Sequence, residues 1–182
     1  MQIGKTLYVK TREEWRSWLE KNHQKESEIW LISYRKFTKK TSVLYNDAVE
    51  EALCFGWIDS ILKKIDLNSY AQRFSPRRAN ANWSPMNKER MRRLIKDKKM
   101  TPAGLAVFEG NLDKPFEIPT DILKELKKDK EVWKNFQKFS DSYKRIRIGW
   151  IDGARKRPEE FKKRLKYFLK MTAQNKTFGM VQ

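Results

Sequence analysis

The apolar and polar positions of the first 110 residues form short runs that predict a small sheet. Thr6 to Lys10 and the Ile-, Trp- and Leu-rich run Glu28 to Lys36 have no helical period, so both predict strands. Ile61 to Ile65 and Tyr70 to Phe74 flank a polar stretch, Asp66 to Ser69, of the length used in hairpins. We therefore expect a mainly antiparallel sheet.

Helix-start signals separate and follow these runs. Thr11 with Glu14 three residues later is a capping box, and Asn46 is a cap candidate for a helix running from Val49 to Trp57. Further starts are predicted at Ser84-Pro85 and Thr101-Pro102. Helices are therefore expected to pack on the sheet.

The last third of the chain has a helical period throughout. Pro115 and Pro119 mark a linker, after which apolar residues recur at helical spacing. Helix starts or breaks are predicted at Thr120, Asp129, Ser140 and Pro158. The pattern predicts an α+β fold with an α+β core domain at 1–113 and a helical subdomain at 114–182.

Composition favours a folded protein, since 39% of the 182 residues are hydrophobic and seven are Trp. The chain contains no apolar run of about 18 residues and its start lacks the apolar region of a secretory signal. We expect a cytoplasmic monomer that does not insert into membranes. Cys54, the one cysteine, lies among apolar helix residues and is interpreted as a packed thiol.

The net charge of +18 is concentrated in two stretches. Residues 73–99 hold ten Lys or Arg against two acids, and residues 144–170 hold eleven against three. Nucleic acid, acidic lipid and phosphorylated metabolites are all admissible partners, and a solvated surface without a partner stays open.

Hydrogen-bond donors and flat side chains are densest between Glu50 and Ile95. The binding residues predicted there are Trp57, Asp59, Arg73, Arg77, Arg78, Trp83 and Asn87. A planar guanidinium matches phosphate or carboxylate, although an ion-pair set with Asp59, Asp66 and the C-terminal acids is an equal alternative. Trp83 would stack on a ring or fix the loop to the core.

Enzyme signatures are sparse. The chain has no phosphate loop, no dinucleotide fingerprint and no His, Cys and acid spacing suited to a metal. A carboxylate beside an arginine has a lowered pKa, which suits Asp59 to ion pairing more than to proton transfer. A non-catalytic role without cofactor or metal is favoured, and an enzyme with a pocket around Asp59 remains an alternative.

The sequence also repeats one tetrapeptide. Gly56-Trp57-Ile58-Asp59 recurs as Gly149-Trp150-Ile151-Asp152, each after a helical pattern. Because the flanking residues barely match, similar packing or chance is favoured over duplication.

Three segments together resemble the YdeI/OmpD-associated family. They are Glu51 to Ser60, Arg73 to Arg78 and Asn82 to Asn87, and similar motifs occur over nearly the whole chain. The resemblance implies bacteriocin protection or a stress-associated role, with no established catalytic residue or cofactor. By position it marks Trp57, Asp59, Arg73, Pro76, Arg77, Arg78, Trp83 and Asn87.

The leading hypothesis is therefore a non-catalytic binder of an anionic ligand or partner, linked to bacteriocin or antimicrobial-peptide resistance or envelope stress. Non-specific binding of nucleic acid is the first alternative. Because the hairpin returns the chain toward the 49–57 helix, we expect Asp59 to lie within reach of Arg73, Arg77 or Arg78.

Overall fold

A computed structural model describes residues 2–78, 81–108, 110, 112 and 114–179. It confirms the α+β class, because a small mixed sheet is combined with helices that lie mostly in the C-terminal part. The chain divides into two compact units, residues 1–81 with 91–110 and residues 82–90 with 111–182. Among the described residues, no helix has the length and apolar character needed to cross a bilayer.

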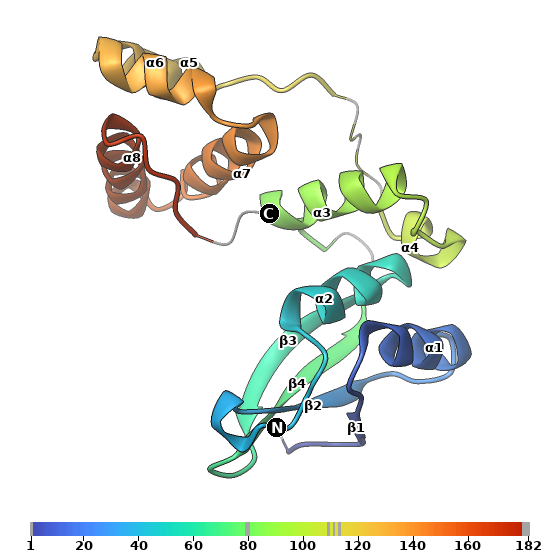
Figure 1. Ribbon diagram of the computed structural model, residues 1–182. Helices are drawn as coiled ribbons and strands as arrows, with labels where there is room; N and C mark the ends of the chain where they lie inside the picture. Colours follow the sequence, from blue (N-terminus) through green and yellow to red (C-terminus); the bar gives the residue numbers. More distant parts are fainter. Residues whose placement is uncertain (1, 79–80, 109, 111, 113, 180–182) are drawn as a thin grey trace. The chain divides into compact units, whose positions relative to one another are not determined.

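The sheet of the first unit contains β1 (Thr6–Tyr8), β2 (Ile29–Tyr34), β3 (Trp57–Lys64) and β4 (Ser69–Pro76). Its order is β1-β2-β4-β3, with β1 parallel to β2 and the other pairs antiparallel. The mainly antiparallel sheet is thus confirmed (Figure 1).

The hairpin between β3 and β4 is closed by Asp66. Its Oδ1 accepts hydrogen bonds from the backbone N–H groups of Asn68 and Ser69 and from the Ser69 hydroxyl. This side chain mimics a backbone turn. Both strands are longer than the sequence predicts, and a register shift lies between Asp59 and Leu62.

Among the described residues, four α-helices lie wholly or partly in the first unit. They are α1 (Arg12–Asn22), α2 (Tyr45–Cys54), α3 (Pro85–Lys96) and α4 (Pro102–Ala106), and a 3-10 turn spans Lys36–Thr38. Helix α3 begins in the second unit and ends in the first.

The start of α1 agrees with the prediction from the sequence, and the start of α2 does not. The Thr11 hydroxyl accepts from the Glu14 N–H as predicted. Asn46 is not a cap, because α2 begins at Tyr45 with Leu44 as its N-cap. The helix also ends at Cys54, three residues earlier than predicted, because Gly56 takes a positive φ of 75° and turns the chain into β3.

The core of the first unit consists of large side chains from α1, α2 and the sheet. Trp15, Leu53, Trp57 and Phe74 are at most 1% exposed, and α1 and α2 lie on one face of the sheet (Figure 1). Helix α4 approaches α2 closely, since a Cβ at Gly104 would lie 2.2 Å from the Cys54 carbonyl oxygen. Glycine is therefore required there.

The second unit is helical beyond the linker. Its helices are α5 (Thr120–Lys127), α6 (Lys130–Lys138), α7 (Asp141–Asp152) and α8 (Pro158–Ala173). Ser140 caps α7 as predicted, and the break predicted near Asp129 is the start of α6, which Asp129 caps. Thr120, a predicted cap, is instead the first residue of α5, with Pro119 as its N-cap.

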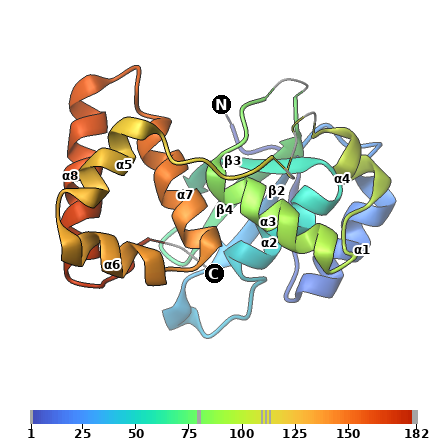
Figure 2. The same ribbon diagram turned by 90° about the horizontal axis from the view of Figure 1, so that it is seen from above.

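These helices pack around a shared apolar interior (Figure 2). The buried residues of this core are Ile122, Leu126, Val132, Phe136, Tyr143, Ile148, Ile151 and Phe168. The segment 82–90 belongs to this unit because Pro85 contacts α7, where a Cβ at Gly149 would lie 2.7 Å from the Pro85 ring.

Candidate functional site

Trp57 and Asp59 project toward the helices from β3. The Trp57 indole is 1% exposed, donates to the His23 carbonyl oxygen at 3.1 Å and meets Trp18 edge-on. The Asp59 carboxylate accepts from the Tyr45 hydroxyl of α2 at 2.8 Å. Trp57 is therefore a core residue, and Asp59 joins the strand to the helix.

Arg73 projects from the opposite face of the sheet. Asp59 is paired with Phe74, so Arg73, one residue earlier on β4, points the other way. Its guanidinium binds Glu28 at 2.7 Å and its Nη1 donates to the Ser60 hydroxyl at 3.3 Å. The pKa of Glu28 is lowered, chiefly by the hydrogen bond from Arg73.

The expected approach of Arg73, Arg77 or Arg78 to Asp59 stays a prediction. The described contact of the Asp59 carboxylate is with Tyr45, and that of the Arg73 guanidinium is with Glu28. The pleat of the hairpin places Asp59 and Arg73 on opposite faces of the sheet.

Arg77 and Arg78 follow at the end of β4 and differ in burial. Arg77 is 8% exposed, its backbone N–H donates to the Gly56 carbonyl oxygen, and burial lowers the pKa of its guanidinium. Arg78 is exposed. Arg77 thus has the burial of a structural residue, and Arg78 has the accessibility that a ligand contact requires.

Trp83 and Asn87 belong to the second unit. Trp83 is half-buried, and the Asn87 side chain accepts from Arg90 at 2.9 Å while its backbone N–H is bonded to Ser84. The structure therefore divides the seven predicted site residues between two separately described units, and their role in ligand binding remains a prediction.

The two basic stretches differ in how many of their cations are paired or buried and how many are exposed. In residues 73–99, Arg73 pairs with Glu28 and Arg93 with Glu50, while Arg77 and Arg90 are buried. Much of the positive charge of residues 73–99 is therefore paired with carboxylates or buried within the fold. Lys96, Lys98 and Lys99 remain exposed at the end of α3.

The stretch 144–170 retains more accessible charge. Three of its arginines form ion pairs: Arg145 binds Glu89 at two 2.8 Å contacts, Arg155 binds Asp121 and Asp152, and Arg164 binds Glu160. Ion pairing with Asp121 and Asp152 raises the pKa of Arg155. Lys163, Lys166, Lys170, Lys156 and Arg157 are exposed and form no ion pair at contact distance with a described carboxylate, although Lys163 and Arg157 act on Glu160 electrostatically.

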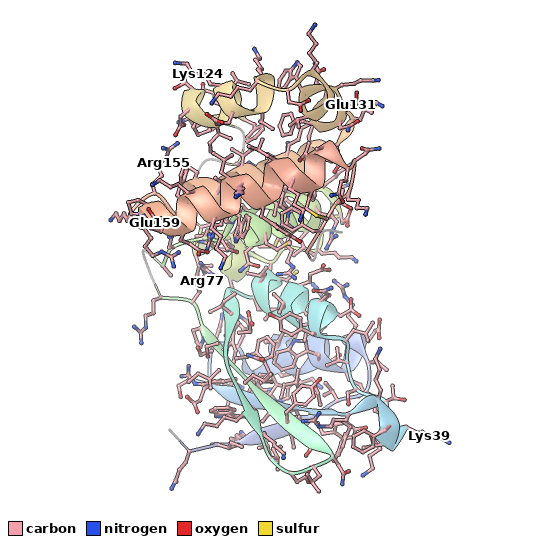
Figure 3. The ribbon with its side chains drawn as sticks, turned by 90° about the vertical axis from the view of Figure 1, so that its left-hand side faces the viewer. Lys39, Arg77, Lys124, Glu131, Arg155 and Glu159 are labelled. Carbon is pink, nitrogen blue, oxygen red and sulfur yellow. The ribbon has the colours of Figure 1, made fainter. Side chains whose placement is uncertain are left out.

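Three of these cations form a row on α8, which we call the α8 lysine row: Lys163, Lys166 and Lys170. Their spacing of three and four residues places them within about 60° of one another around the helix. Figure 3 shows α8 along its length, with Arg155 and Glu159 at its N-terminal end. The opposite side of α8 packs through Phe168, which is fully buried. The row therefore faces solvent.

Sequence reasoning did not single out these lysines. The signal that would have found them was the excess of positive charge in 144–170 combined with the helical spacing of the apolar residues in α8. No group of three or more His, Cys, Asp or Glu in the described ranges is arranged to hold a metal ion. Electrostatic attraction of an anion is the chemistry that this surface offers.

Comparison with known protein families gives two matches. Residues 115–175 match the family described as Bacteriocin-protection, YdeI or OmpD-Associated, which confirms the resemblance for the C-terminal region. Residues 7–107, which include the Glu51-to-Ser60 and Arg73-to-Arg78 motifs, match a different model, Domain of unknown function (DUF8412). Searches of curated proteins and of solved structures gave no match. Since the longer match covers more than half of the residues, the chain belongs to the DUF8412 family, followed by a region of the YdeI or OmpD-associated type.

Proposed function

We propose that the protein is a non-catalytic binder of an anionic partner, held through the α8 lysine row, and that it acts in bacteriocin protection. The observation that carries the binding role is the row itself, three exposed lysines on one face of a helix that form no ion pair at contact distance with a described carboxylate. The physiological part rests on the description of the family matched by residues 115–175.

The charge of the second unit supports this assignment. Residues 82–90 and 111–182 contain 21 Lys or Arg and 11 Asp or Glu, a net charge of +10. Lysine keeps its ammonium group hydrated on a flexible stem, so it suits contacts with a string of charges rather than a shaped pocket. A partner with several regularly spaced negative groups therefore fits better than a single small anion.

Nucleic acid is the second candidate, and the spacing within the row favours it. Steps of three and four residues advance about 4.5 and 6 Å along a helix. A strand of duplex DNA carries one phosphate per roughly 3.4 Å of axis, so neighbouring lysines would reach successive or alternate phosphates. Such contacts position a protein on the backbone without reading sequence.

A binding titration tests the proposal. Duplex DNA, single-stranded RNA and vesicles of phosphatidylglycerol are titrated separately at low and physiological salt, with vesicles of phosphatidylcholine as the neutral control. We expect an anionic probe to bind at low salt and to weaken as salt rises, because phosphate contacts release counterions. Absence of binding to all three anionic probes at low salt contradicts the proposal.

A further inference from the structure

A second feature of the helical unit is an arginine enclosed by aromatic rings. Arg147, in the second half of α7, is 7% exposed, and its guanidinium carbon lies 5.3 Å from the Tyr143 ring, 6.0 Å from Trp150 and 4.4 Å from Phe178. We call this group the Arg147 cage. Tyr143 and Trp150 also belong to α7, whereas Phe178 comes from the segment after α8.

The polar groups of the cage are incompletely satisfied. Arg147 Nη2 donates to the Phe178 carbonyl oxygen at 2.5 Å. Among the described residues, the buried Arg147 Nε and Tyr143 hydroxyl have no well-formed hydrogen bond, although the hydroxyl interacts with the guanidinium and with the Phe178 backbone. No carboxylate of the described residues lies within ion-pair distance of the guanidinium. Burial also lowers the pKa of Arg147 and raises that of Tyr143.

Such an arrangement is costly without an anion. A buried cation loses its hydration, and attraction to an opposite charge with further hydrogen bonds is what offsets that loss. The three rings around the guanidinium and one neutral carbonyl oxygen bonded to one nitrogen compensate only part of it. A leucine or methionine would fill the same space without this cost, so the charge itself needs an explanation.

The position of Phe178 shows which groups the Arg147 cage can accommodate. Its ring lies among Trp150, Tyr167 and Phe168 at centroid distances of 5.9, 4.8 and 6.4 Å, while its own carbonyl oxygen binds the guanidinium. In phenylalanine the ring and the carbonyl carbon are separated by two carbon atoms. The cage therefore already accommodates a phenyl ring and an acceptor oxygen at that spacing.

The segment that carries Phe178 is suited to leave the cage. Helix α8 ends at Ala173, and Asn175 follows with a positive φ of 51°. Residues 176–179 form neither helix nor strand. The remaining walls belong to α7 and α8, which stay in place if this segment moves away.

We infer that the Arg147 cage binds a ligand with an aromatic ring and a carboxylate two carbons apart, and that Phe178 occupies this site in cis. The carboxylate would replace the Phe178 carbonyl on Nη2 and also accept from Nε and from the Tyr143 hydroxyl. A free aryl carboxylate and the C-terminal phenylalanine of a peptide share this chemistry. The site is separate from the α8 lysine row, so either can fail without the other.

Titration calorimetry with 3-phenylpropanoate tests the inference, with 3-phenylpropanamide as the neutral isostere. The Phe178→Ala protein should bind the acid at least about tenfold more tightly than the unmodified chain, because the competing ring is gone, and should bind the amide at least about tenfold more weakly than the acid. A peptide ending in Gly-Gly-Phe distinguishes the two sources: tighter binding than 3-phenylpropanoate assigns the site to peptide termini, and weaker binding assigns it to free acids.

Arg147→Leu provides the second arm, since it keeps an apolar side chain in the cage and removes the charge. It should abolish binding of the acid. If Arg147→Leu does not fold, a chain ending at Thr177 takes its place and should bind the acid as tightly as Phe178→Ala does. Equal affinity for acid and amide, undiminished binding by folded Arg147→Leu, or no binding by the opened variants would each overturn the inference.

Discussion

The carboxylate of Glu51, 2% exposed on α2, accepts a hydrogen bond from Arg16 of α1 at 2.7 Å. Arg12 donates to its other oxygen at 2.5 Å and also approaches Asp47 and Glu50. These contacts join two helices through a buried ionic network. Removal of one buried partner leaves the others uncompensated.

Glu51→Gln should therefore lower the free energy of unfolding by about 2 to 4 kcal/mol, below the upper values for buried pairs because both arginines are partly exposed. Urea unfolding at neutral pH measures this. The matched control is Glu20→Gln, since Glu20 binds the same Arg16 at 3.4 Å but is 54% exposed, and it should cost less than about 1 kcal/mol. Equal losses in the two variants would show that burial does not matter here.

Gly104→Ala tests the contact between α4 and α2. Its Cβ would lie 2.2 Å from the Cys54 carbonyl oxygen, a backbone atom that cannot move without displacing α2. We expect a fall in melting temperature well beyond that of Ala103→Gly, which changes one methyl group in the same helix and costs about 1 kcal/mol through helix propensity. A Gly104→Ala protein as stable as the unmodified chain would contradict the close approach.

The Cys54 thiol should be unreactive in the folded protein. Burial raises its pKa to about 11, so little thiolate forms at neutral pH, and the side chain is fully buried. A disulfide reagent at pH 8 should label the native chain far more slowly than the chain unfolded in guanidinium. Rapid labelling of the native protein would indicate that the end of α2 opens readily.

Asp66 gives the hairpin a pH dependence. Hydrogen bonds from the Asn68 and Ser69 backbone lower its pKa, so its contribution to stability is present above the unfolded pKa of about 3.9 and is lost as pH falls through the lower folded value. Asp66→Ala should therefore unfold at lower urea than the unmodified chain at pH 7, and the difference should shrink in strong acid. A difference that does not depend on pH would exclude the carboxylate as its cause.

Local signals in the sequence were sufficient to locate many elements. Thr11 and Ser140 cap helices where predicted, because a side-chain oxygen near an N-terminus acts within three residues. The repeated tetrapeptide shows where local signals end. Gly56 to Asp59 enters a strand and Gly149 to Asp152 lies in a helix, so tertiary packing decides between them.

The candidate site was harder to predict than the fold. The sequence placed Asp59 just before the first strand of the hairpin and Arg73 near the end of the second, but the face that each side chain takes depends on a register that a one-residue change reverses. The burial of Arg77 and Arg147 could not be predicted from the sequence either, because it depends on contacts between residues that are distant in the chain. The charge excess in 144–170, by contrast, was visible from composition.

The most direct test of the proposed function compares two triple variants with equal net charge. Lys163→Gln/Lys166→Gln/Lys170→Gln removes the α8 lysine row, and Lys25→Gln/Lys36→Gln/Lys39→Gln removes three exposed lysines of the first unit. The measurement is the slope of log affinity for duplex DNA against log salt concentration. The account predicts that the slope becomes shallower by about 2 to 3 in the first variant, roughly 0.9 per lost phosphate contact, and is unchanged in the second. Equal slopes for the two variants would contradict the assignment of binding to α8.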